Sequence, residues 1–97
     1  MSQPLVVIAT LIAKPGQAAA LQKHLETLVQ ATRQEPGCIT YELHQDLESA
    51  EGFYMFERWV DAAALQSHDG TEHIQAFRAA AGDLLAHFEI KRLNLVA

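Results

Sequence analysis

The segment at residues 52–60, GFYMFERWV, limits the possible folds more than any other part of the sequence. Residues of a strand point alternately to the two faces of a sheet. Both faces of this strand therefore carry large apolar side chains: Phe53, Met55 and Trp59 with Glu57 on one, and Tyr54 and Phe56 with Arg58 on the other. Such a strand needs a cover on each side of its sheet. We expect helices on one side and a second copy of the chain on the other.

The rest of the chain alternates between strand-like and helical patterns. Strands are predicted at residues 5–13, 38–45 and 84–96, where β-branched and apolar residues gather or alternate. Apolar residues recur every three or four positions at 17–33, 62–68 and 71–81, which predicts helices. In the strand at 38–45, alternation puts Ile39, Tyr41 and Leu43 on one face. Pro36-Gly37 ends the first helix, and Asp61 is suited to cap the second.

This order predicts an α+β fold of the ferredoxin-like β-α-β-β-α-β type with a four-stranded antiparallel sheet. With 97 residues, we expect residues 1–97 to form a single domain. A domain this small leaves much apolar surface uncovered, which also favours a homodimer.

Composition argues against several classes of protein. The chain has 7 basic and 12 acidic residues and a formal net charge of -5, which disfavours partners such as nucleic acid or anionic membranes. Its one cysteine, Cys38, excludes a disulfide within the chain. The apolar run near the start lacks a basic region and a cleavage site and is too short for a bilayer, so we expect no membrane association and a cytoplasmic location.

Several motifs resemble the antibiotic biosynthesis monooxygenase family, including its small quinol monooxygenases. They are the Pro36-Gly37 turn, the Glu57-x-Trp59 strand end, an Ala-Leu helix ending at His68, and His73 before Phe77. The resemblance covers nearly the whole chain. It implies a dimeric α+β barrel with a cavity between sheet and helices in each subunit. It also implies oxidation of a small aromatic substrate, phenolic or quinol, by molecular oxygen, with no flavin, haem or metal as cofactor.

His68 and His73 are the candidate catalytic bases. The imidazole side chain changes charge close to neutral pH, so it can remove a proton from a phenol. The alternative is that either one caps a helix or lies at a solvated surface. Two histidines five positions apart with no close third ligand do not form a zinc or iron motif, so we predict no metal site.

The other candidates are Glu57 as a catalytic group, and Trp59, Tyr41 and Phe77 as substrate-binding residues. Trp59 could stack on a flat substrate and donate its indole N–H, or it could be plain core. Tyr41 and Phe77 carry the same alternative of core packing. Glu57 shares a face with Trp59 and needs a polar partner if it is buried, for which Arg92 is one choice.

The leading hypothesis is a monooxygenase that uses no cofactor. One alternative is an isomerase that moves protons on a small carbonyl compound or phosphosugar with the same histidines. Another is a dimeric binding module without catalytic activity. Because one fold can support unrelated activities, the fold does not choose among the three.

Overall fold

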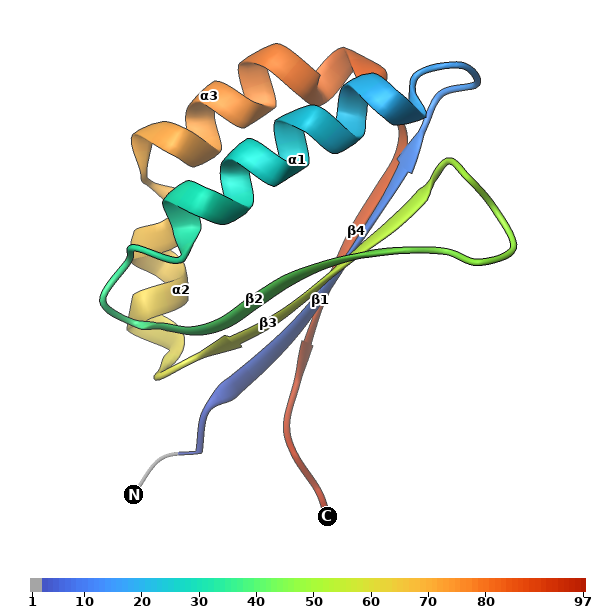
Figure 1. Ribbon diagram of the computed structural model, residues 1–97. Helices are drawn as coiled ribbons and strands as arrows, with labels where there is room; N and C mark the ends of the chain where they lie inside the picture. Colours follow the sequence, from blue (N-terminus) through green and yellow to red (C-terminus); the bar gives the residue numbers. More distant parts are fainter. Residues whose placement is uncertain (1–2) are drawn as a thin grey trace.

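The computed structural model describes residues 3–97, and Figure 1 shows their arrangement. The elements follow the predicted order: β1 (Leu5–Ala13), α1 (Ala18–Thr32), β2 (Cys38–Gln45), β3 (Gly52–Trp59), α2 (Ala62–Asp69), α3 (Glu72–Ala81), a 3₁₀ turn η1 (Gly82–Leu84) and β4 (Leu85–Leu93). The four strands form one sheet in the order β2-β3-β1-β4, with every neighbouring pair antiparallel. The predicted ferredoxin-like fold is confirmed.

All the helices lie on one face of the sheet (Figure 1). The core lies between the helices and the sheet and includes alternate strand residues, a stripe of α1, and Leu65 and Ile74 of the two later helices. Among its buried residues are Val7, Ala9, Leu11, Met55, Trp59, Leu21, Leu25 and Leu28. Within the described residues, nothing covers the other face of the sheet (Figure 1). Among residues 3–97, no helix is both long and apolar enough to cross a membrane.

The strand register aligns one row of side chains across the face that carries the helices. Val7 in β1 is opposite Glu57 in β3 and Arg92 in β4, and Glu57 is in turn opposite Tyr41 in β2. Side chains at paired positions point to the same face. The row therefore consists of the Tyr41 phenol, the Glu57 carboxyl group, the apolar Val7 side chain and, on the edge strand β4, the Arg92 guanidinium group.

Two details of the strands differ from the prediction. Alternation predicted Ile39 on the face of Tyr41, but Ile39 is 45% exposed and lies at a shift in the β2–β3 register between Cys38 and Thr40. The extra residue at such an irregularity leaves the regular alternation. The last strand is also shorter than the predicted 84–96. It ends at Leu93, and Leu84 belongs to the 3₁₀ turn.

The Pro-Gly pairs form two turns with different requirements for glycine. Gly16 has φ +81°, and the Gln17 N–H donates to the Lys14 carbonyl at 3.0 Å, so a side chain there would strain the backbone. Gly37 has no positive φ; its requirement is a close approach to helix α2. A Cβ atom placed on Gly37 would lie 2.3 Å from Cβ of Ala64.

Substitution of Gly37 by Ala should therefore push α2 away from the turn. We expect Gly37→Ala to lower the free energy of unfolding by about 1–3 kcal/mol, the usual cost of overpacking. Gly82→Ala is the matched control, because a Cβ there meets nothing within 4 Å. Thermal denaturation measures both variants, and equal melting temperatures for the two would contradict the close approach.

Candidate active site

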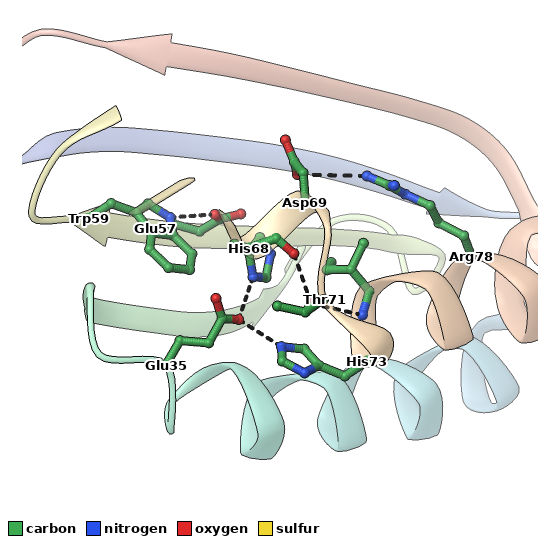
Figure 2. Close-up of polar contacts among 9 residues, drawn as sticks. Glu35, Glu57, Trp59, His68, Asp69, Thr71, His73 and Arg78 are labelled. Atoms are coloured by element: carbon green, nitrogen blue, oxygen red, sulfur yellow. Dashed lines mark hydrogen bonds and ion pairs between the residues drawn. The ribbon is translucent and has the colours of Figure 1, made fainter. Parts of the chain in front are cut away.

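A cluster formed by Glu35, His68 and His73, called here the His–Glu–His cluster, joins three parts of the chain (Figure 2). Nδ1 of His68 and Nε2 of His73 each lie 2.7 Å from the same oxygen, Oε2 of Glu35. With Glu35 as a carboxylate, which only accepts hydrogen bonds, both ring nitrogens donate. His68 then keeps Nε2 free as an acceptor, which is the tautomer that a base requires.

Local backbone structure fixes each member of this cluster. The Cys38 N–H donates to the Glu35 carbonyl at 3.1 Å, which closes a tight turn with Pro36 directly after Glu35. Helix α2, capped by the Asp61 carboxylate, ends next to His68. Thr71 caps α3, and its hydroxyl also donates to the His68 carbonyl at 2.8 Å. The break between α2 and α3 therefore presents both histidines to Glu35.

The His68 ring packs among aromatic side chains and is only 3% exposed. Its centroid lies 4.7 Å from that of Trp59 and 5.6 Å from that of Tyr41. Trp59 is itself fully buried. This packing leaves the imidazole little freedom to rotate, so Glu35 and the two aromatic rings together fix the direction of its nitrogen atoms.

Glu57 provides a second buried polar group beside this packing. The indole N–H of Trp59 donates to Oε1 of Glu57 at 2.9 Å, and Glu57 is 4% exposed. Burial is the main cause that raises the pKa of Glu57 to about 7; the Asp69 and Glu35 carboxylates raise it further, and the Trp59 hydrogen bond opposes the shift. A carboxyl group of this kind exchanges a proton near neutral pH, which is a property of catalytic groups.

Burial also raises the pKa of two neighbouring groups. The pKa of the Tyr41 phenol rises mainly through burial and secondly through the Glu57 carboxylate, so its hydroxyl stays protonated and available as a donor. The pKa of the Cys38 thiol rises for the same first reason, with the Glu35 carboxylate next. A thiol nucleophile needs the opposite shift, which argues against thiol chemistry at Cys38.

His68, Glu57 and Tyr41 border a cavity of about 340 Å³ between the sheet and the helices. Most of its wall is apolar and comes from β1, β3, β4, α1 and α3. Four predicted site residues lie on this wall: His68, Glu57, Tyr41 and Phe77. The volume is in the range of cavities that hold one small ligand.

The structure locates the other two predicted residues behind this wall. Trp59 does not line the cavity; it contacts it only through its hydrogen bond to Glu57 and its packing on His68. His73 borders a smaller cavity with His24 and Phe77, and it reaches His68 through Glu35. Glu57 bonds to Trp59 and makes no ion pair with Arg92.

Glu35 was not among the predicted site residues. Residues 34–37 were predicted only to end the first helix, because no pattern within that segment indicates what a side chain at a turn will meet. The single available indication was an acidic residue next to a Pro-Gly turn that belongs to the family resemblance.

The mouth of the cavity is charged and partly apolar. Arg78 lies 3.7 Å from Asp69 in an exposed ion pair, and Arg92 stands on the edge strand (Figure 2 for the pair). Phe88 and Ile90 of the same strand are about half exposed and also line the cavity. A ligand at this mouth would meet both apolar surface and positive charge.

Comparison with known proteins places the chain in a family. Residues 4–80 match the family model described as antibiotic biosynthesis monooxygenase. The Mycobacterium tuberculosis protein named "Putative monooxygenase Rv0793" is 35% identical over 85 residues, which cover 88% of this chain and 83% of that protein. The crystal structure of PA3566 from Pseudomonas aeruginosa is 45% identical, with a TM-score of 0.95 over 100% of this chain and 98% of that one.

The chain belongs to the antibiotic biosynthesis monooxygenase family, as its motifs indicated. Membership of this family supports a monooxygenase-like function, and thus an oxidoreductase. The substrate and the use of oxygen are separate questions.

The raised pKa of Glu57 predicts that pH changes stability. The unfolded side chain loses its proton from about pH 4.5, whereas the folded one keeps it until about pH 7. Unfolding therefore releases a proton in this window, and the free energy of unfolding falls as pH rises through it, by on the order of 3 kcal/mol. Glu57→Gln, which keeps an acceptor for Trp59, removes this loss.

Chemical denaturation of wild type and Glu57→Gln at pH 5 and pH 8 measures the effect. The variant should gain stability relative to wild type on going from pH 5 to pH 8. Glu26→Gln, at an exposed position of α1, is the control and should show no such gain. A difference between wild type and Glu57→Gln that is the same at both pH values would contradict the raised pKa.

Proposed function

We propose that this protein is a monooxygenase that oxidises a small phenolic or quinol substrate with molecular oxygen and without a cofactor. The observation that carries the proposal is a buried imidazole, His68, held in one tautomer by Glu35 at the wall of an apolar cavity. Family membership adds independent support for oxygen chemistry. The apolar wall suits an aromatic ring and keeps water from it.

Proton removal is the first chemical step. The free Nε2 of His68 takes the proton of a substrate hydroxyl group as general base. The Tyr41 hydroxyl and the neutral form of the Glu57 carboxyl group can donate hydrogen bonds to the oxygen anion that results, since both line the same cavity. The phenolate is a better electron donor than the phenol, so it can reduce oxygen directly.

The overall reaction balances with oxygen as the sole oxidant. A quinol and one O₂ give a hydroxyquinone and one water; one oxygen atom enters the ring, and the other leaves as water with two substrate hydrogens. The substrate loses four electrons and O₂ gains four. Glu35 and His73 do not touch the substrate in this scheme. They are positioning residues that fix the His68 ring.

We propose that the working form is a homodimer joined through the uncovered face of the sheet. The middle of that face carries apolar side chains that are only half buried in the single chain: Val6, Ile8, Ile12, Tyr54 and Phe56. Charged residues such as Glu42, Arg58, Glu89 and Lys91 surround them in the strand register. An apolar centre with a polar rim is typical of an interface between copies.

Oxygen uptake with a panel of quinols tests the chemistry. We expect turnover by wild type and a fall in kcat of about 10²–10⁴-fold in His68→Gln, the usual contribution of a general base. Tyr41→Phe should lower kcat by about 10²-fold, the cost of one donor to an anion. His44→Gln, an exposed histidine on the edge strand β2, is the control and should retain wild-type kcat.

The outcomes separate the alternatives. Turnover that persists without oxygen identifies an isomerase or a related proton-transfer enzyme and contradicts the proposal. Binding of quinols without turnover identifies a binding module and contradicts it as well. Oxygen-dependent turnover that His68→Gln leaves unchanged assigns the base to another residue.

The dimer has its own test. Phe56→Asp introduces a charge at the centre of the uncovered sheet face, so it should convert the dimer to a monomer. Ala79→Asp adds the same charge on the exposed face of α3 and should leave the dimer intact. Light scattering after size-exclusion chromatography measures the mass of each; a monomeric wild type would refute this assembly.

A further inference from the structure

The His–Glu–His cluster contains the three ligands that the sequence did not show together. His68 and His73 were judged unable to hold a metal because no third ligand stands near them in the sequence. Glu35, 33 residues before His68, supplies that ligand through the fold. One nitrogen atom from each histidine and a carboxylate oxygen all lie within 4.8 Å of one another.

We propose that the His–Glu–His cluster is a binding site for one divalent transition-metal ion of the zinc class. The ligand atoms are Nδ1 of His68, Nε2 of His73 and one carboxylate oxygen of Glu35. Two imidazoles and one carboxylate favour zinc, cobalt, nickel or copper over magnesium and calcium, which prefer oxygen ligands alone.

The distances require an adjustment of all three ligand side chains. Zinc binds imidazole nitrogen and carboxylate oxygen at about 2.0–2.2 Å, so tetrahedral neighbours lie about 3.3 Å apart. The two N···O distances are 2.7 Å, so the Glu35 oxygen must withdraw by roughly 0.6 Å from each nitrogen atom to admit the ion. The two histidine nitrogen atoms, which lie within 4.8 Å of each other, must in turn approach to about 3.3 Å.

The cluster also has a route to solvent on one side. The side chain of His68 is 4% exposed, that of Glu35 is 12% exposed and that of His73 is 26% exposed. An ion can therefore enter beside His73, and a water molecule can take the fourth position there. The tight turn at Glu35 and the Thr71 hydrogen bond to the His68 carbonyl already hold two of the ligands.

Metal binding would change the tautomer of His68. In the hydrogen-bonded form Nδ1 carries the proton and donates to Glu35. An ion on Nδ1 displaces that proton to Nε2, the nitrogen atom that acts as base in the proposed function. Inhibition of oxygenation by zinc is therefore a consequence that rests on the proposed function, whereas metal binding itself does not.

Titration of metal-stripped protein with Zn²⁺ in a calorimeter and with Co²⁺ by visible absorption tests the site without any activity assay. We expect one ion per chain, with the absorption spectrum of tetrahedral Co²⁺. Loss of a residue that only orients a ligand typically costs about 10–100-fold in metal affinity. Glu35→Gln replaces an anionic ligand by a neutral amide and His73→Gln removes an imidazole, so each should weaken binding by at least about 100-fold. His44→Gln is the control and should bind like wild type.

Circular dichroism first establishes that both ligand variants are folded, and having two of them keeps the test valid if one fails to fold. ¹⁵N NMR of the His68 ring gives a second measurement, because zinc should move its proton from Nδ1 to Nε2. Absence of binding, or binding that both variants retain, would overturn the proposal. Zinc binding in a protein that shows no oxygen uptake would support the metal site and reject only the oxygenase.

Discussion

The site depends on one carboxylate that two imidazole rings share. Glu35 accepts a hydrogen bond from His68 and from His73 at 2.7 Å each, and it thereby connects the turn after α1 to both sides of the α2–α3 break. A carboxylate that is 12% exposed needs such partners, because burial of an unpaired charge is costly. The same two bonds that satisfy Glu35 select the tautomer of His68. The hydrogen bonds that hold these three segments together therefore also set which nitrogen atom of His68 can act as a base.

The sheet forms the floor of the cavity, and its strand register sets where polar side chains lie on that floor. Strand register places Tyr41, Glu57, Val7 and Arg92 in one row, so polarity changes along a single line across the cavity floor. Glu57 and Arg92 lie two strand spacings of about 4.8 Å apart, and the Glu57 carboxyl group bonds to Trp59 rather than to Arg92. Burial raises the pKa of Glu57 in this position to about 7. The packing that shapes the cavity therefore also sets its acid–base behaviour.

Both faces of the sheet carry apolar side chains that must be shielded from water, and the cover differs between the two faces. Apolar side chains on the helical face are covered by the helices, which leave the 340 Å³ cavity among them. Nothing in residues 3–97 covers those on the opposite face, and a second copy is the cover that we propose. Because β1 and β3 are the central strands, they carry apolar side chains for both the cavity face and the uncovered face. The strands that line the cavity are thus the ones that a dimer would stiffen.

Periodicity and turn residues act over short distances, so the sequence predicted the order of the elements, and its motifs indicated the family. Of the six candidate site residues that the motifs and the strand positions suggested, His68, Glu57, Tyr41 and Phe77 lie on the cavity wall. Only the tertiary structure brought Glu35 to the two histidines, turned Ile39 outward at an irregular register, and withdrew Trp59 behind Glu57. Each of these depends on how separate segments pack together. No pattern within one segment records a contact between side chains 33 residues apart.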